Sequence, residues 1–331
     1  MTPKYVLAIE SSCDDCAVAI INHKNQICAD IIYSQIKPHA PFGGIVPEIA
    51  SRQHLNRIAE MVQKALEEAN LKPKEIEAVA VTNKPGLIGS LLVGVMFAKG
   101  FAQALKIPIL GVDHIEGHLL AGLGEPDFPE PPWIGLIASG GHSALYLCDA
   151  EYHITLLGQT RDDAAGEAFD KIGRMMGLSY PAGKEIDRLA QTGDSERFEF
   201  PIALRSKDNL EYSFSGLKTA AKLKLEKQKL NPQDCADFCA SLQKAIAQAL
   251  LAKARLACER YQIKSLVFGG GVVANSRLRA EAQKLSFEQG LKLYLPLQKH
   301  CVDNAVMIAK AALRRFKLGE KEDFDFSVEA S

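Results

Sequence analysis

Two histidines, His114 and His118, stand four residues apart in a stretch that reads Asp-His-Ile-Glu-Gly-His from residue 113. If this stretch is helical, both imidazoles leave one face of the helix a turn apart, which is how a helix offers two nitrogen ligands to a transition metal. The preceding run 107–112 is typical of a buried strand, and open α/β sheets bind ligands where strands end. Two histidines on a solvated helix are the alternative. Glu116 does not directly follow His114, so the HExxH motif of zinc proteases is not met.

Acidic residues elsewhere in the chain could complete such a site. Asp303 lies at the start of the last expected helix, about 302–317, and with the two histidines it would leave metal positions open for substrate oxygens. Taken alone, Asp303 is more simply an N-cap of that helix. Asp14 and Asp15 follow the first expected strand, where they could hold a metal-bound phosphate or orient a nucleophile. Turn formation is their simpler role.

Glycine-rich turns suggest a phosphate-bearing ligand. The turn 139–141, Ser-Gly-Gly, can present backbone N–H groups in a concave nest, although a hairpin turn without a ligand has the same sequence. Three glycines at 269–271 follow a buried strand and would let a flat ring approach the backbone. Asn275, at the next helix start, can cap the helix or bond a ribose.

Two charged stretches can each be interpreted as an ordinary structural feature or as part of a functional site. Asp163, Glu167 and Asp170 would share one helix face, and three acids exceed what the helix dipole favours. Five lysines between residues 218 and 229 predict either a solvated helix face or a nucleic-acid footprint.

The elements that must position these residues recur in two halves of the chain. Each half opens as strand, tight polar turn, strand and strand, followed by helices and further strands. The first set is expected at 4–10, 17–21 and 27–34, and the second at 133–138, 144–148 and 153–160. This internal duplication predicts an α/β fold of the actin, sugar-kinase and heat-shock ATPase type, with two RNase H-like lobes around a central cleft.

A proline-dense stretch, 125–132, marks the expected lobe boundary. The N-terminal lobe would cover 1–131 and carry the histidines. The C-terminal lobe would cover 132–331, with the last helix free to pack back onto the first lobe. The helix ending near Leu105 is almost wholly apolar and is expected to be buried, with Gly89 and Gly94 allowing close packing. The tail from Lys321 is expected to fray.

Bulk composition narrows the class of protein. With 331 residues and 47% hydrophobic content, the chain is an ordinary globular protein of two lobes. A net charge of −1 argues against wholesale electrostatic binding to nucleic acid. No apolar run is expected to span a membrane, and no signal peptide opens the chain. Eight scattered cysteines predict the reducing cytoplasm.

Together, eight motifs resemble the TsaD family of tRNA N6-adenosine threonylcarbamoyltransferases, formerly called glycoproteases. The resemblance covers about residues 4–317, and the motifs occur in order at 10–15, 43–48, 113–118, 139–143, 162–171, 212–218, 269–275 and 303–304. Any one motif is weak, whereas eight in register are specific. Three positions depart from the usual family pattern: Lys84 and Ala182 replace glycines, and Cys16 replaces a threonine.

The resemblance implies the duplicated ATPase-like fold and a tRNA-modifying reaction. A threonylcarbamoyl group would pass from threonylcarbamoyl-AMP to N6 of the adenosine 3′ of the anticodon, at position 37, in tRNAs reading codons that begin with A. The resemblance also implies one Fe²⁺ or Zn²⁺ on His114, His118 and Asp303. It assigns substrate contacts to Ile137, Ala138, Ser139, Gly140, Gly141, Asp170, Gly183, Asp187 and Asn275. Similar bacterial proteins work with an inactive paralogue of the same fold (TsaB-like), a small P-loop ATPase (TsaE-like) and a separate synthase that supplies the adenylate.

The donor in this reaction is already activated as a mixed anhydride, so the protein has to position N6 and stabilise developing charge. We expect Asp14 to orient or deprotonate the attacking amine, and we place Glu10 of the same motif with it as a catalytic candidate. The main rival function is a small-molecule kinase or ATPase of the same superfold, in which the histidine pair would have no task. A metalloprotease and a non-enzymatic nucleotide-binding scaffold are further alternatives.

Overall fold

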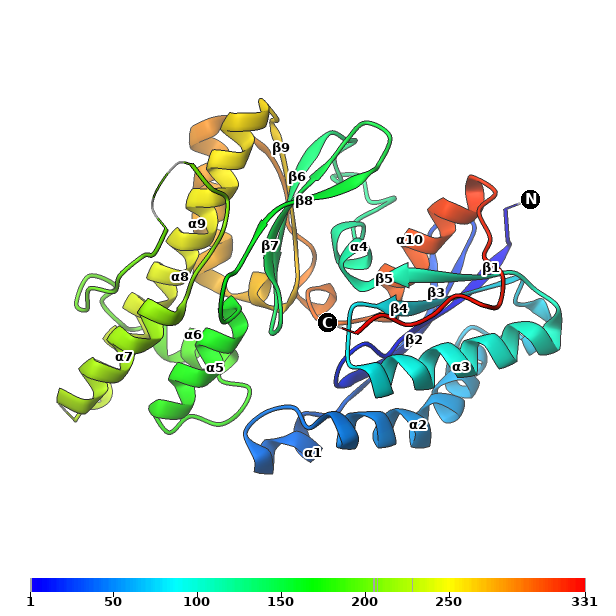
Figure 1. Ribbon diagram of the computed structural model, residues 1–331, viewed down its shortest axis with the longest axis horizontal. Helices are drawn as coiled ribbons and strands as arrows, with labels where there is room; N and C mark the ends of the chain where they lie inside the picture. Colours follow the sequence, from blue (N-terminus) through cyan, green and yellow to red (C-terminus); the bar gives the residue numbers. More distant parts are fainter. Residues whose placement is uncertain (1, 205, 207, 228, 331) are drawn as a thin grey trace. The chain divides into compact units, whose positions relative to one another are not determined.

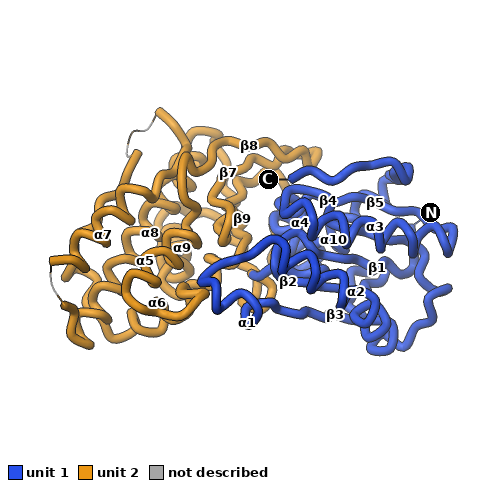
Figure 2. Tube along the Cα trace, turned by 60° about the horizontal axis from the view of Figure 1, so that its bottom comes forward, with its two compact units in different colours: residues 1–126, 302–331 blue, residues 127–301 orange. Residues whose placement is uncertain are grey.

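The protein is described here from a computed structural model that covers residues 2–330 except 205, 207 and 228. The chain separates into two compact units (Figure 2). Unit 1 comprises residues 1–126 and 302–331, and unit 2 comprises residues 127–301. Each unit is described by itself.

Unit 1 is built on a five-stranded mixed sheet in the order β3-β2-β1-β4-β5. Its strands are β1 (Tyr5–Glu10), β2 (Asp15–Asn22), β3 (Ile27–Ser34), β4 (Ala78–Lys84) and β5 (Ile109–Asp113). The first three are antiparallel neighbours, whereas β4 and β5 run parallel to β1. The central strands are almost continuously apolar because they are buried on both faces. Glu10 pairs with Ala17 in the last register position of the β1–β2 hairpin, so the intervening tip carries Asp14.

Within its described residues, unit 1 contains five α-helices, of which the longer ones cover its sheet on both sides. The five are α1 (Ile36–His39), α2 (Pro47–Glu68), α3 (Ile88–Leu105), α4 (His114–Leu119) and α10 (Ala305–Lys317). Helices α2 and α3 pack on each other along one side, and α10 lies on the other, where it contacts β1, β2 and α4 (Figure 1). The predicted close approach at Gly94 is confirmed, since a Cβ there would lie 2.1 Å from Ser11 Oγ.

Unit 2 repeats the sheet topology of unit 1. Its strands are β6 (Trp133–Ala138), β7 (Ser143–Cys148), β8 (Ile154–Gln159), β9 (Ser265–Gly269) and β10 (Lys292–Tyr294), in the order β10-β9-β6-β7-β8. Strands β6, β7 and β8 are antiparallel neighbours, and β9 and β10 run parallel to β6. The duplication predicted from the order of elements is therefore confirmed in the topology of the two sheets.

The helices of unit 2 are α5 (Ala165–Met175), α6 (Gly183–Ala190), α7 (Ser215–Lys227), α8 (Pro232–Tyr261) and α9 (Ser276–Gln289). Helix α8 is the longest, and its apolar side chains join those of β6, β9 and α5 in one core. Its start is fixed by Asn231, whose side chain accepts the N–H of Asp234, with a proline at the first helical position.

Helix α3 corrects the prediction that it is buried all round. Only 33% of its 18 residues are buried, although its length and apolar composition are sufficient to span a membrane. One face, including Leu91 and Val95, packs into the core of unit 1. The opposite face exposes Ile88, Leu92 and Met96, which are spaced four residues apart and are 50%, 45% and 63% exposed. The helix therefore packs as part of a globular unit and still presents an apolar stripe.

The prediction that the tail frays from Lys321 is wrong for the segment 322–329. The Glu322 carboxylate accepts the N–H of Gly111 in β5 at 2.6 Å. Further along, Asn83 Nδ2 donates to the carbonyl oxygen of Ser327, and Asn83 O accepts the N–H of Glu329. The side chain of Phe326 packs against the core of unit 1. The end of the chain thus lies along the sheet edge and the β4 terminus.

Candidate metal centre and neighbouring sites

Helix α4 begins directly where β5 ends, and Asp113 makes this possible. Its carboxylate accepts the N–H groups of Ile115 at 2.7 Å and Glu116 at 3.3 Å, which caps the helix at its first turn. The predicted helix is confirmed, and it places the His114 and His118 rings with centroids 4.6 Å apart. Both histidines are buried, with exposures of 4% and 1%.

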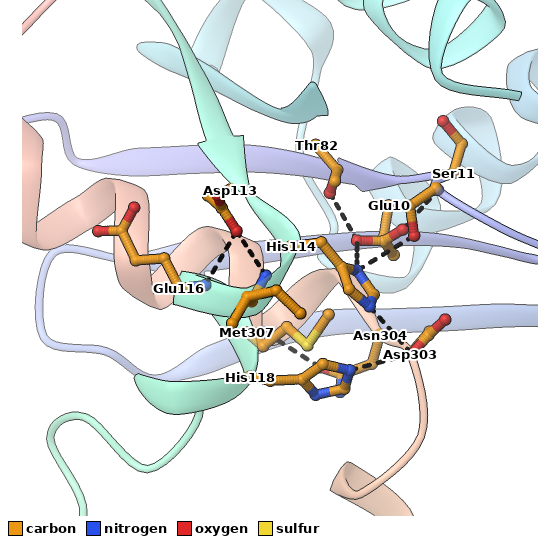
Figure 3. Close-up of polar contacts among 12 residues, drawn as sticks. Glu10, Ser11, Thr82, Asp113, His114, Glu116, His118, Asp303, Asn304 and Met307 are labelled. Carbon is orange, nitrogen blue, oxygen red and sulfur yellow. Dashed lines mark hydrogen bonds and ion pairs between the residues drawn. The ribbon is translucent and has the colours of Figure 1, made fainter. Parts of the chain in front are cut away.

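Asp303 faces the two histidines. Its Oδ1 lies 3.1 Å from His118 Nε2 and 3.5 Å from His114 Nε2, and Figure 3 shows both rings turned toward it. The cap of α10 is Asn304, whose side chain accepts the N–H of Met307 at 3.0 Å. The alternative of Asp303 as the N-cap is therefore wrong, and its carboxylate is available to the histidines.

These three side chains fit a divalent transition metal. One ligand atom from each lies within 4.8 Å of the others, in a buried setting, so the group could hold a metal ion. Two imidazole nitrogens and one carboxylate oxygen are a common donor set for iron and zinc, and three protein ligands leave positions open. Across the described part of the chain, this is the one such cluster of histidine, cysteine and acidic side chains. Glu116 points away from the pair in Figure 3, which further disfavours a zinc-protease arrangement.

Glu10 contacts the Nδ1 atom of the His114 ring. It is fully buried at the end of β1, and its Oε2 lies 3.0 Å from His114 Nδ1. Oε2 also accepts the hydroxyl of Thr82 at 2.5 Å, and Oε1 accepts the N–H of Ser12 at 2.6 Å. Burial opposes its charge, but His114 outweighs burial and holds the pKa of the Glu10 carboxyl below its ordinary value. Burial likewise opposes a charged imidazole, yet Asp303 and Glu10 outweigh it and raise the pKa of His114 to about 9.

Asp14 and Asp15 occupy the tip of the β1–β2 hairpin and are half-buried. Burial and the charge of Asp303 raise the pKa of Asp14 above its ordinary value. Burial, with Asp14 and Asp303, raises the pKa of Asp15 to about 7. The preceding carbonyl of Cys13 contacts His54 Nε2 at 2.9 Å, which anchors the tip on α2. The two aspartates therefore lie within electrostatic reach of Asp303.

The glycine-rich turn after β6 belongs to unit 2. Ser139 N–H donates to His142 O at 2.8 Å, and Ser139 Oγ accepts the N–H of His142 at 3.1 Å. A Cβ at Gly140 or Gly141 would meet open space, so both are accessible to a ligand. The buried end of β6, residues 137–138, leads into this turn. Gly270 has a φ of 95°, and a Cβ there would lie 2.5 Å from Ala138 O, so glycine is needed where β9 approaches β6.

A second group of predicted contacts surrounds the start of α9. Asn275 caps this helix by accepting the N–H of Leu278 at 3.0 Å, and its Nδ2 donates to Gln243 Oε1 at 2.9 Å. Asp187 accepts the hydroxyl of Ser276 at 2.6 Å and lies 3.4 Å from Asn275 Nδ2. The structure thus brings Asp187 and Asn275 together. Sequence reasoning missed Gln243, although a buried amide on an apolar helix face is a detectable signal.

Asp170 and Gly183 are linked by the junction of α5 and α6. The Asp170 carboxylate accepts the N–H of Ala182 at 2.7 Å, and Gly183 is the first residue of α6. All nine predicted substrate contacts lie in unit 2, whereas the predicted metal ligands, Asp14 and Glu10 lie in unit 1.

The acids predicted to share one helix face, Asp163, Glu167 and Asp170, already have partners within unit 2. Asp163 precedes α5 and pairs with Lys171 at 2.5 Å and with Lys218. Glu167 accepts the N–H of Ala164 at 3.1 Å, which is an ordinary capping contact. The lysine run is partly neutralised as well, since Lys218 faces Asp163 and Lys222 lies 3.8 Å from Glu226.

The three departures from the usual family pattern are accommodated locally. Lys84 is the last residue of β4, and its Nζ lies 3.7 Å from Glu329 in the docked tail. Ala182 precedes α6 with a φ of −84°, which any residue adopts. Cys16 is fully buried in β2. None of the three requires a backbone conformation that favours glycine.

Comparison with known proteins identifies the family of this chain. The family described as TsaD, tRNA N6-adenosine threonylcarbamoyltransferase, matches residues 26–310. A protein of that name from Anaeromyxobacter sp. (strain Fw109-5) is 46% identical over 98% of both chains. One from Streptococcus mutans is 44% identical over 100% of this chain and 98% of its own.

Similarity to solved structures extends to the fold alone. Full-length HypF, in a phosphate- and nucleotide-bound form, aligns with a TM-score of 0.63 at 14% identity, over 96% of this chain and 56% of its own. Component A of the (R)-2-hydroxyglutaryl-CoA dehydratase from Acidaminococcus fermentans aligns with a TM-score of 0.56 at 14% identity, over 94% of this chain and 98% of its own. These neighbours confirm the predicted actin-like ATPase fold.

Proposed function

Because this chain belongs to the TsaD family of tRNA N6-adenosine threonylcarbamoyltransferases, we propose that it transfers threonylcarbamoyl from threonylcarbamoyl-AMP to N6 of adenosine 37 in tRNAs reading codons that begin with A. The observation that carries this proposal is the convergence of His114, His118 and Asp303 in one buried group. A kinase or ATPase of the same superfold would have no use for that group and is not favoured.

The reaction needs positioning more than nucleophilic power. The N6 nitrogen attacks the carbamoyl carbon, a C–N bond forms, and the C–O bond to the phosphate breaks. AMP leaves with the bonding electron pair, and N6 loses one proton. Asp14 is the proposed acceptor of that proton, because burial and Asp303 raise the pKa of its carboxyl and so strengthen it as a base.

The proposed metal is Fe²⁺ or Zn²⁺, held by His114, His118 and Asp303. When bound, it would supply a Lewis acid for the oxygens of the donor. The chain's own contribution is a fixed, buried set of donor atoms and a rigid capped helix that carries two of them.

Unit 2 is proposed to bind the adenylate part of the donor. In the turn 139–141 the Ser139 N–H already donates to His142 O, so Gly140 and Gly141, which are unobstructed, are proposed to offer their backbone N–H groups to a phosphate. Asp187 and Asn275 form a polar pair for a ribose. Gly271 after β9, where a Cβ would meet nothing within 4 Å, would admit a flat base. Asp170 and Gly183 complete this proposed contact set.

A protein partner is proposed to dock on α3. Its stripe of Ile88, Leu92 and Met96 is exposed, although each side chain is apolar. An ordered apolar stripe on a helix is typical of a surface that packs against another helix. The proposed occupant is the inactive TsaB-like paralogue of the same fold, with the TsaE-like ATPase and the adenylate synthase as further partners. The eight free cysteines fit a reducing compartment, the cytoplasm.

The test incubates the purified chain and its partners with unmodified tRNA and threonylcarbamoyl-AMP. Before digestion, the reaction mixture should contain one AMP released per threonylcarbamoyl group transferred. Nuclease digestion of the recovered tRNA followed by mass spectrometry should then yield N6-threonylcarbamoyladenosine. Phosphorylation of a small metabolite from ATP, with no modified adenosine formed, would instead establish the kinase function.

A further inference from the structure

Glu10 has the contacts of a residue that holds another side chain rather than one that meets a substrate. It is 0% exposed, and its two oxygens are engaged by three groups of unit 1. The Ser12 N–H comes from the hairpin tip, the Thr82 hydroxyl from β4, and His114 Nδ1 from α4. Figure 3 shows Glu10 on the far side of the His114 ring from Asp303.

These contacts determine which nitrogen of His114 carries the proton. Oε2 accepts the Thr82 hydroxyl at 2.5 Å and lies 3.0 Å from Nδ1, so the carboxylate, which can only accept, requires an N–H at Nδ1. Ser12 Oγ, which lies 3.1 Å from the same nitrogen, then acts as a second acceptor. In the neutral imidazole, Nε2 then keeps its lone pair, and this is the nitrogen that faces Asp303 at 3.5 Å. Once its Nε2 proton is lost, a histidine fixed in this way binds a metal through Nε2 without a change of tautomer.

We propose that Glu10 is a positioning residue that fixes the tautomer and orientation of His114, and that Thr82 fixes Glu10 in turn. The inference rests on the proposed metal centre, and it replaces a direct catalytic role for Glu10 with one exerted through His114. The structural feature that identifies this support is Thr82, a buried polar residue near the end of β4 whose partner Glu10 lies in the adjacent strand β1.

Glu10→Gln tests the proposal because the amide keeps the shape of the side chain and cannot satisfy all three neighbours. If the amide oxygen faces His114, the NH₂ group meets the N–H of Ser12, and two donors oppose each other. If the amide is flipped, its NH₂ group faces Nδ1 and favours the tautomer in which Nε2 carries the proton. Either arrangement should weaken metal binding by about 10- to 100-fold.

The measurement is a titration of the metal-free chain with Co²⁺, followed by the visible absorption of the bound ion. Glu116→Gln is the matched control, since Glu116 lies on α4 and points away from the histidines. Thr82→Val should also weaken binding, by a smaller factor, whereas Thr82→Ser retains the hydroxyl and should bind like the wild type. Circular dichroism confirms that each variant is folded.

Two outcomes would overturn the proposal in different ways. If the wild type binds Co²⁺ and folded Glu10→Gln binds it equally well, Glu10 does not position His114, while the metal centre and the proposed function stand. If the wild type does not bind Co²⁺, the metal centre itself is wrong, and the role of Glu10 falls with it.

Discussion

At the scale of single residues, the side chains that could be recognised were those whose spacing lies within one element. His114 and His118 share a helix face by their spacing alone, and Asp113 supplies the cap that starts that helix. The contacts of Glu10 with Thr82 and Ser12 could not be read in the same way. The contact with Thr82 depends on β4 lying beside β1, a pairing between segments 72 residues apart, which local patterns do not encode. The contact with Ser12 is local, but it depends on the backbone conformation of the hairpin tip.

Asp14→Asn should reduce transfer to tRNA by about 10²- to 10⁴-fold, because the amide cannot accept the proton from N6. Binding of Co²⁺ should change much less, since Asp14 is outside the ligand group. Single-turnover transfer with saturating donor separates the two effects. Full activity in this variant would remove Asp14 from the chemistry.

Asp15 should make the metal-free protein less stable as the pH rises. Its pKa is about 7 in the fold against an ordinary value of 3.8, so the folded state favours the neutral acid. The stability that this preference contributes is complete below about pH 3.8 and is lost as the pH rises to about 7. Asp15→Asn cannot ionise. Its free energy of unfolding relative to the wild type should therefore rise by on the order of 2 kcal/mol from about pH 5 to about pH 7.5.

Urea unfolding in a metal chelator, at both pH values, measures this difference. Asp149→Asn serves as the control, because local hydrogen bonds lower the pKa of Asp149 and no such gain is expected. A difference between Asp15→Asn and wild type that stays constant with pH would contradict the burial argument.

At the scale of elements, the strands and long helices could be predicted from periodicity. What each element packs against could not be predicted in this way. Helix α3 is apolar on every side, and hydropathy alone cannot tell whether a second chain or the core covers a given face. The prediction of a frayed tail failed for a similar reason. Its segment 322–329 has little periodicity, yet it is held by backbone bonds to β5 and Asn83 that only the folded sheet edge offers.

Removing the tail after Gly319 should lower the free energy of unfolding by about 2–4 kcal/mol, since it deletes apolar packing and bonds to the sheet edge. Phe326→Ala should account for about 1–3 kcal/mol of this loss, because its ring packs on the core of unit 1 and lies 4.2 Å from Lys99 Nζ. Asp325→Ala, at an exposed position of the same segment, should have little effect. Chemical denaturation measures all three, and a truncated chain as stable as the full one would contradict docking of the tail.

At the scale of the whole molecule, one sheet topology carries two chemically different turns. Strands β1 and β6 occupy the same place in their sheets. The residues that follow β1 include Asp14, whereas those that follow β6 are Ser139, Gly140 and Gly141. The duplication was predictable because the order of elements repeats. The difference in proposed role between the units rests on the residues at equivalent turns, which are acidic in one unit and glycine-rich in the other.

Charged substitutions on the α3 stripe should impair partner-dependent activity selectively. Leu92→Glu with Met96→Glu should weaken affinity for the purified TsaB-like paralogue by about 30-fold or more, because each replaces an exposed apolar contact with a charge. Co²⁺ binding should be unchanged. Phe287→Glu is the control, since Phe287 is 91% exposed on α9 of unit 2. Calorimetric titration measures the affinity, and equal losses in both variants would contradict docking on α3.

The central claim, that the group on α4 and Asp303 supports threonylcarbamoyl transfer, is tested most directly by linking metal content to product. The metal-free chain, the chain reloaded with Fe²⁺ or Zn²⁺, and folded His118→Ala are compared in the tRNA assay, with Glu116→Gln as control. We predict one metal per chain, transfer restored on reloading, and a loss of at least about 100-fold in His118→Ala, with little change in Glu116→Gln. Full formation of N6-threonylcarbamoyladenosine by a chain verified as metal-free, or by His118→Ala, would contradict the account.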